Sequence, residues 1–321
     1  MGNGDEPLWP AIDPDEPRQR RRRRAPAVAA LALALALAVL AALTAGATAT
    51  TASRTIDGRA LPASTAARTT TTTTTAPTPT STTPPLRRIY RLADHPLLVN
   101  GAALPPATCQ LPPFRRDKAS LHAYYVAYVE CMDRTWQPVL TERGMPHTPP
   151  AINTSEHPGE TGCGNPDDGE VGEFTAMYCP ADQTLYLPVD RLKDVDGGVA
   201  TSHLAVVAHE YVHHVQELSG LMGAFAAETD KVGEKTEKGN ELSRRLELQV
   251  NCFAGLFLAA AQGHGTIGPS VAKRAVDEFR NGGLPQTHGS RANQAAWAQR
   301  GYQQRTTAAC NTFAAPPREV S

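Results

Sequence analysis

The sequence predicts an α+β domain, mainly helical with a small β-sheet, preceded by a transmembrane helix and a disordered linker. Three observations support this architecture. Beyond residue 88, several runs carry apolar residues at helical spacing, with two short strand-like runs among them. An apolar stretch over residues 25–49 follows a basic run. A segment dominated by Thr, Ala and Pro separates that stretch from the globular part.

The N-terminal segments indicate export. Residues 1–24 end in a basic run that includes Arg20 to Arg24, and residues 25–49 consist almost wholly of Ala, Leu and Val. About 20 uncharged apolar residues can cross a bilayer as a helix, and a basic flank keeps that end in the cytoplasm. We therefore expect a single-pass anchor in the cell membrane, with the globular part extracytoplasmic. A cleaved signal peptide, which would leave a secreted protein, is the alternative.

The linker and the globular part differ sharply in composition. Residues 50–88 contain an uninterrupted threonine run from Thr69 to Thr75. Such a segment cannot bury enough apolar surface to offset the entropy lost on ordering, so we expect it to be disordered. Residues 89–315 are enough for one domain with a sizeable core. The net charge of -1 gives no sign of a nucleic-acid partner, so none is expected.

All six cysteines lie beyond the apolar stretch, which agrees with an oxidising compartment and disulfide bonds. Six cysteines allow many connectivities, and sequence alone does not choose among them. Pairing between sequence neighbours would give Cys109–Cys131, Cys163–Cys179 and Cys252–Cys310. No two cysteines show the C-x-x-C spacing, so a cysteine zinc site is not expected.

Helical periods and turn signals predict the elements of the globular part. A helix is expected over residues 119–139, ending near Pro138, and residues 146–172 should form a loop. Two strands should follow, over residues 173–179 and 184–188. Further helices are expected over residues 201–218, 241–261 (capped by Asn240), 270–279 and 290–302, with residues 228–239 as a polar connection.

The expected helix over residues 201–218 carries His209 and Glu210, with His213 one turn after His209. Four residues make just over one turn, so both imidazoles project from one face and can share one Zn²⁺. Glu210 lies beside that face, where its carboxylate can serve as the catalytic base toward a zinc-activated water. The helix is apolar nearly all round and should be buried. Two satisfied core histidines are the alternative interpretation.

A zinc site of this kind needs a third protein ligand and keeps the fourth position for water. A third histidine further along is excluded, because Ser219 stands where it would be. Glu247 is the candidate, since it lies among apolar residues in the middle of the second long helix. An ordinary salt bridge to Arg244 or Arg245 is the alternative. Asn251, one turn later, could accept a hydrogen bond from a ligand histidine.

Three other histidines have different expected roles. His214 points about 100° around the helix from His213, so it should be structural or exposed at the rim. His203 lies nearly two turns before the motif on another face. His288, in a loop, could donate a hydrogen bond to the oxyanion of a tetrahedral intermediate, which would make it catalytic. The alternative is a helix-entry residue before the N-cap Ser290.

At these residues the sequence resembles the bacterial neutral zinc metallopeptidase family, over residues 104–313. The resemblance rests on these runs: Tyr178-Cys179-Pro180-Ala181-Asp182-Gln183, His209-Glu210-Tyr211-Val212-His213-His214-Val215-Gln216, Glu247-Leu248-Gln249, Cys252-Phe253-Ala254-Gly255 and Thr287-His288-Gly289-Ser290. It implies a membrane-tethered protein with a zincin-like peptidase fold. It also implies His209, His213 and Glu247 as zinc ligands and Glu210 as the catalytic residue.

Two positions depart from the pattern of that family. Asn251 stands where the family usually has Asp, so the acceptor oxygen is kept and the charge is lost. Ala298 replaces an aromatic residue. The expected function is zinc-dependent hydrolysis of peptide bonds in a peptide or protein substrate, which could pair with an edge strand at residues 184–187. A pseudo-peptidase that binds without cleaving and a zinc hydrolase of cell-wall peptides are the alternatives.

Overall fold

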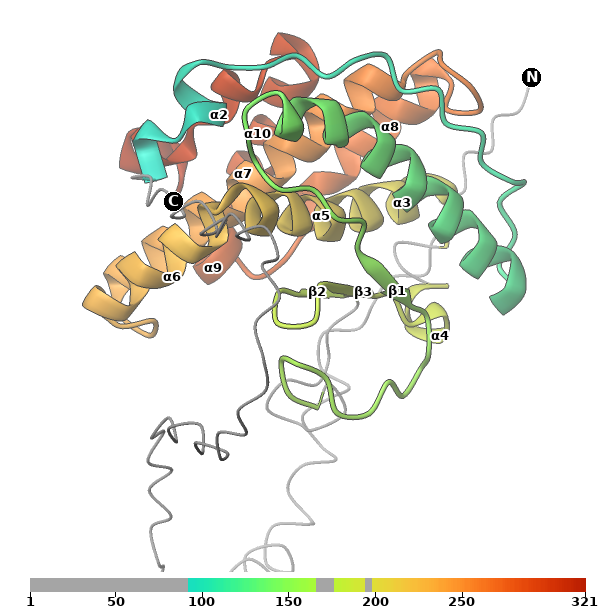
Figure 1. The fold of residues 1–321 in the computed structure, drawn as a ribbon, viewed down its shortest axis with the longest axis horizontal. Helices are drawn as coiled ribbons and strands as arrows, with labels where there is room; N and C mark the ends of the chain where they lie inside the picture. Colours follow the sequence, from blue (N-terminus) through green and yellow to red (C-terminus); the bar gives the residue numbers. More distant parts are fainter. Residues whose placement is uncertain (1–91, 166–175, 194–197) are drawn as a thin grey trace, which may run out of the picture. The chain divides into compact units, whose positions relative to one another are not determined.

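Helices form most of the domain, as the sequence predicts, and a small sheet lies at one side of them (Figure 1). The computed structural model describes residues 92–165, 176–193 and 198–321. The expected basic segment, apolar stretch and linker, which together cover residues 1–88, lie outside this part. Among the residues that are described, no helix combines the length and the hydropathy needed to cross a membrane.

The helices vary widely in length. The longer ones are α3 (Lys118–Thr141), α5 (Ala200–Ser219), α6 (Leu221–Val232), α7 (Glu237–Ala261), α8 (Pro269–Glu278) and α10 (Arg291–Gln304). The short ones are α2 (Pro96–Val99), α4 (Val189–Leu192) and α9 (Pro285–His288). Single 3-10 turns are η1 (Leu92–Asp94), η3 (Phe279–Asn281), η4 (Thr307–Cys310), η5 (Thr312–Ala314) and η6 (Pro317–Glu319).

Three helix boundaries differ from the prediction. Helix α3 continues through Pro138 to Thr141, because a proline near the end of a helix removes only one hydrogen bond of the ladder. Helix α6 extends into the expected polar connection, since one face of its first turns packs on the core. Helix α7 starts earlier than Asn240. Its cap is Thr236, whose side chain accepts a hydrogen bond from the backbone N–H of Gly239.

The sheet contains β1 (Ala151–Asn153), β2 (Met177–Cys179) and β3 (Thr184–Tyr186) in the order β1-β3-β2. Strand β1 pairs parallel with β3, and β2 pairs antiparallel with it. Strand β1 was not expected, because three residues within a loop-like stretch carry no readable period. The expected edge strand at residues 184–187 is wrong: β3 is central, and β2 is the edge that packs against α5.

The core lies where α3, α5 and α7 meet. Trp136 on α3 packs against Phe253 on α7 with ring centroids 5.4 Å apart, and Tyr128 packs against Phe257 at 5.7 Å. Helix α5 crosses the middle of the domain, in contact with α3, α7, α8 and β2 (Figure 1). These contacts fix the position of α5, and with it the positions of the side chains that project from this helix.

Helices α7 and α10 approach each other unusually closely. A Cβ at Gly255 would collide with the backbone carbonyl of Ala298, and a Cβ at Gly301 would collide with the carbonyl of Cys252. Only glycine at these two positions allows the two backbones to meet. Ala298, where an aromatic residue was expected from the family pattern, is fully buried at this contact.

The three disulfides that sequence neighbours suggested are confirmed. Cys109–Cys131 joins the segment before α3 to that helix, and Cys163–Cys179 joins the loop before the sheet to the end of β2. Cys252–Cys310 joins α7 to η4. Each link connects a helix or strand that forms the domain to an irregular segment that covers it.

His203 is buried in the contact between α5 and α3, away from the histidine motif. Its Nδ1 lies 2.7 Å from the hydroxyl oxygen of Tyr125, and the two rings stack. Burial, with a smaller contribution from Arg116, lowers the pKa of His203 from 6.5 to about 4. The folded protein therefore holds this side chain neutral, whereas the unfolded chain protonates it near pH 6.5.

The first prediction concerns the pH dependence of stability. The contribution of neutral His203 is fully present above pH 6.5 and is lost as the pH falls toward about 4. His203→Gln should therefore lose less free energy of unfolding than the wild type between about pH 7.5 and 4.5, by about 2 kcal/mol. Urea unfolding at both pH values measures this difference. The exposed control His264→Gln should follow the wild type, and equal losses in His203→Gln and wild type would refute the prediction.

Candidate metal centre

Three histidines surround one carboxylate where α5, α7 and the end of α9 meet. The Oε2 atom of Glu247 lies 3.1 Å from Nε2 of His209, 3.4 Å from Nε2 of His213 and 3.5 Å from Nε2 of His288. His209 and His213 project from one face of α5, and Glu247 faces them from the middle of α7. The structure thus brings together the residues that the sequence suggested as metal ligands, and it adds His288.

The other nitrogen of each motif histidine has a fixed partner. Nδ1 of His209 lies 3.0 Å from Oδ1 of the buried Asn251, and Nδ1 of His213 lies 3.1 Å from Oε1 of Gln216. The amide nitrogen of Gln216 donates to Oε1 of Gln249, which fixes the orientation of that amide. Both Nδ1 atoms therefore carry a hydrogen that they donate outward, and both Nε2 lone pairs face Glu247.

These lone pairs and the carboxylate need a positive species between them. Oε2 of Glu247 is buried and has no hydrogen-bond partner among the described residues. A buried carboxylate oxygen that faces nitrogen lone pairs is strongly unfavourable unless a proton or a metal ion lies between them. Imidazole nitrogen and carboxylate oxygen are ligands that Zn²⁺ takes in proteins. The residues at this centre therefore fit a zinc ion.

The electrostatics of the cluster agree with this arrangement. Burial alone would raise the pKa of Glu247, but His213 and His209 outweigh it and hold this pKa well below the usual range. Burial alone would lower the pKa of His213, but the charge of Glu247 outweighs it and raises the pKa to about 9. A metal ion that binds between Glu247 and His213 would therefore displace a proton.

Glu210 is bonded to β2 through one of its carboxylate oxygens. Its Oε2 accepts a hydrogen bond from the backbone N–H of Tyr178 at 2.9 Å. The Tyr178 hydroxyl lies 3.0 Å from Nδ1 of His214, whose Nε2 donates to the carbonyl of Thr148 at 2.7 Å. Strand β2 is thus tied to α5 by its backbone and by its side chain. His214 is fully buried, so the expectation of a structural role is confirmed and that of a rim position is wrong.

The alternative salt bridge of Glu247 is wrong. Arg244 pairs with Glu237 at 2.8 Å, and Arg245 pairs with Glu241 at 2.6 Å. Both guanidinium groups therefore have other partners, and the groups paired with Glu247 are the three imidazoles.

His288 is the last residue of α9, and Ser290 caps α10 as expected. The ring of His288 stacks on that of His209, with centroids 6.1 Å apart and planes inclined by 20°. The side chain is 27% exposed, and it points into the cluster. His288 therefore belongs to the cluster and does not serve only as the entrance of a helix.

Sequence reasoning missed two contacts of the site. The first is Gln216, which orients His213 and links α5 to α7. The sequence could have indicated Gln216, because this residue lies three positions after His213 and therefore on the same face of a buried helix. The second is the backbone N–H of Tyr178, which orients Glu210. A backbone group carries no signal in a residue pattern, so this contact could not have been found from the sequence.

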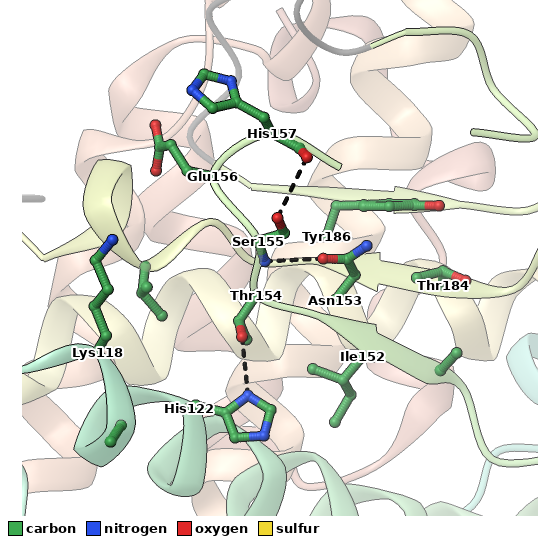
Figure 2. Close-up of a pocket in the computed structure, with 13 residues that line it drawn as sticks. Lys118, His122, Ile152, Asn153, Thr154, Ser155, Glu156, His157, Thr184 and Tyr186 are labelled. Carbon is green, nitrogen blue, oxygen red and sulfur yellow. Dashed lines mark hydrogen bonds between the residues drawn. The ribbon is translucent and has the colours of Figure 1, made fainter. Parts of the chain in front are cut away.

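A separate pocket of about 1060 Å³ lies beside β1. Figure 2 shows Lys118, Glu156 and Tyr186 around it, together with the hydrogen bond between His122 and Thr154. None of the residues that line this pocket belongs to the histidine cluster. The chemistry suggested by the cluster therefore does not take place in this pocket.

Comparison with known proteins agrees with the geometry. The family model described as "Putative neutral zinc metallopeptidase" matches residues 114–313, and the chain belongs to this family. It is 31% identical over 204 residues to the uncharacterized protein YpfJ of Escherichia coli, covering 56% of this chain and 67% of YpfJ. It is 30% identical over 225 residues to the uncharacterized protein Rv2575 of Mycobacterium tuberculosis, covering 59% and 70%. No solved structure matches the chain.

The second prediction concerns the bond between Tyr178 and His214. Tyr178→Phe should lower the free energy of unfolding by about 1–3 kcal/mol, because Nδ1 of a buried histidine loses its donor. The zinc content should not change, since the hydroxyl is not part of the cluster. Denaturant unfolding and metal analysis of the purified chain measure the two effects. Loss of zinc from Tyr178→Phe would contradict the separation of the two sites.

The third prediction concerns Asn251. Asn251→Asp should tighten zinc binding by about 10-fold, because a carboxylate at Nδ1 of His209 makes Nε2 of that ring a stronger ligand. Competition with a chromophoric chelator measures the affinity. Asn100→Asp adds the same charge at an exposed position after α2 and should leave the affinity unchanged. Equal or weaker binding by Asn251→Asp would contradict this role.

Proposed function

We propose that the protein is a zinc-dependent metallopeptidase with a zincin-like fold, in which His209, His213 and Glu247 hold the metal and Glu210 is the catalytic base. The observation that carries this proposal is the buried Oε2 of Glu247, which faces the Nε2 lone pairs of two histidines one turn apart. Membership of a zinc metallopeptidase family supports the same assignment.

The chain's own residues supply the proton transfers. A bound zinc ion would polarise the scissile carbonyl and make the attacking water more acidic. One oxygen of Glu210, Oε2, is held by the N–H of Tyr178. This bond orients the carboxylate and leaves Oε1 to take a proton from the attacking water and to deliver it to the leaving amine. The fixed strand thus keeps the base in place during both transfers.

Strand β2 is the edge that suits an extended substrate. The N–H of Tyr178 points away from β3, toward Glu210. In an antiparallel strand the N–H and the C=O of one residue point to the same side, so the carbonyl of Tyr178 also faces the site. The N–H of Tyr178 is already bonded to Glu210, so we infer that the backbone of a peptide substrate donates a hydrogen bond to this carbonyl, next to the base.

We also propose that the domain acts outside the cytoplasmic membrane. The apolar residues 25–49 would anchor it, and residues 50–88 would hold it away from the bilayer. All six cysteines are paired in disulfides, as in proteins of oxidising compartments. Fractionation of cells that produce a C-terminally tagged full chain tests this. Tag in the membrane fraction supports an anchor, tag in the medium supports a cleaved signal, and tag in the cytosol refutes both.

The fourth prediction separates metal binding from chemistry. Glu210→Gln should keep zinc and lose hydrolysis by a factor of about 10²–10⁴, because the amide can still accept from Tyr178 but cannot take a proton. His213→Ala should lose both zinc and hydrolysis. Metal analysis and cleavage of a mixed peptide library by the full chain measure the two properties.

The exposed control Glu228→Gln should behave as the wild type in both assays. Full activity of Glu210→Gln would show that the proposed mechanism is wrong. Stoichiometric zinc without cleavage in the wild type would favour a peptide-binding pseudo-peptidase, which is the role that the missing charge at Asn251 would suit. Cleavage of cell-wall peptides alone would restrict the substrate to that class.

A further inference from the structure

His288 belongs to the cluster but has no part in the three-ligand site proposed above. It comes from α9, a separate segment of the chain, and its Nε2 lies 3.5 Å from Oε2 of Glu247. One ligand atom each from His209, Glu247 and His288 lie within 4.8 Å of one another. The side chain of His288 is therefore as close to the carboxylate as that of the motif residue His213.

The hydrogen bonds of His288 suit the tautomer with its hydrogen on Nδ1. Nδ1 lies 2.9 Å from the hydroxyl oxygen of Thr287, and that hydroxyl lies 3.4 Å from the carbonyl oxygen of Leu284. When the hydroxyl donates to this carbonyl, its oxygen accepts from Nδ1–H. Nε2 of that tautomer has a lone pair and no hydrogen. It suits a metal ligand, whereas a donor to an oxyanion needs a hydrogen on this atom.

The distances lead to the same conclusion. Ligand atoms about 2.0–2.1 Å from a tetrahedral zinc ion are separated from one another by about 3.4 Å. The distances from Glu247 Oε2 to the three Nε2 atoms are 3.1, 3.4 and 3.5 Å. A donor to the oxyanion would not contact the ion itself. It would lie about 2.7–3.1 Å from an oxyanion bound to the ion, and therefore further from the ion than the ligands do. A ligand atom of His288 also lies within 4.8 Å of those of His209 and Glu247, so His288 can share one ion with these two residues.

The geometry points to His288 as a fourth protein ligand of the metal in the resting protein. This inference rests on the proposed zinc site and adds one imidazole to it. A fourth protein ligand occupies the position that a catalytic zinc site keeps for water. Hydrolysis then requires that α9 withdraws His288 or that the ion accepts a fifth ligand, so α9 would control access of water to the site.

Helix α9 is held on its inner side and exposed on its outer side. Arg244 donates to the carbonyl of Gln286, and Gln294 donates to the carbonyls of Gly283 and Gly289. Leu284, just before the helix, is 75% exposed. Gly289 after it has φ of 78°, a conformation that favours glycine. A Cβ at Gly283 would lie 2.5 Å from the Nε2 and Cε1 atoms of the His288 ring. Gly283→Ala should therefore push the imidazole out of the cluster while the residue itself is retained.

X-ray absorption at the zinc edge, which counts the imidazoles bound to the ion, tests the inference on the zinc-loaded full chain. Three imidazoles are expected in the wild type, and two in His288→Ala and in Gly283→Ala. Zinc binding by His288→Ala, measured by chelator competition, should weaken by about 100-fold or more, beyond what loss of an outer hydrogen bond costs. The control His264→Ala, on an exposed loop, should keep three imidazoles and wild-type affinity.

The outcomes distinguish this inference from the proposed function. Two imidazoles in zinc-loaded wild type would overturn the role of His288 and leave the three-ligand site intact. A wild-type chain that does not bind zinc would overturn both. The inference would also be wrong if the ion in Gly283→Ala still bound three imidazoles and His288→Ala bound zinc with wild-type affinity. The result for Gly283→Ala would count even if His288→Ala folded poorly.

Discussion

The structure of this protein depends on one buried carboxylate that has to be neutralised. Glu247 lies in the middle of α7, among apolar residues, where an isolated negative charge would be strongly destabilising. Nearby imidazoles make the position tolerable, and they come from separate parts of the chain. Helices α5 and α7 therefore have to be held in one relative placement for the charge to be stable.

Several features of the scaffold serve that placement. Gln216 bonds to His213 within α5 and to Gln249 on α7, so the two helices that carry the candidate ligands share a buried polar link. On the other side of α7, Gly255 and Gly301 let α10 approach closely. Cys252 is the residue after Asn251, and its disulfide with Cys310 holds the same turn of α7. Rigid elements of this kind keep ligand positions defined before a metal binds.

Much of the site could be predicted because its strongest signals are local. The spacing of His209 and His213 puts both rings on one helical face whatever the rest of the fold does. Glu247 could be chosen because a carboxylate among apolar helix residues calls for a partner. The three disulfides could be predicted because each cysteine pairs with its neighbour in the sequence. The alternative salt bridge from Glu247 to Arg245 was wrong because Arg245 pairs with Glu241. Which partner a side chain meets depends on the face of α7 from which it projects.

What could not be predicted depends on contacts between distant segments. Strand β1 exists only because β3 is there to pair with it, and its three residues have no period of their own. The position of β3 in the centre of the sheet follows from that pairing. The bond from Tyr178 to Glu210 joins a backbone group to a helix 32 residues away. The family resemblance pointed to the residues of the site, and the tertiary structure supplied their orientation.

The disulfide at Cys179 has a consequence for how reductants would act on this protein. Cys179 is the last residue of β2, and the residue before it, Tyr178, orients Glu210. The imidazole nitrogens of the candidate metal centre are on helices that this disulfide does not touch. Cys163 is exposed, whereas Cys252 and Cys310 are buried, so the disulfide at the end of β2 is the more accessible of these two. A thiol that reduced only Cys163–Cys179 would free the end of β2 and leave α5 and α7 in place. Loss of activity in a thiol would then not by itself indicate removal of a metal.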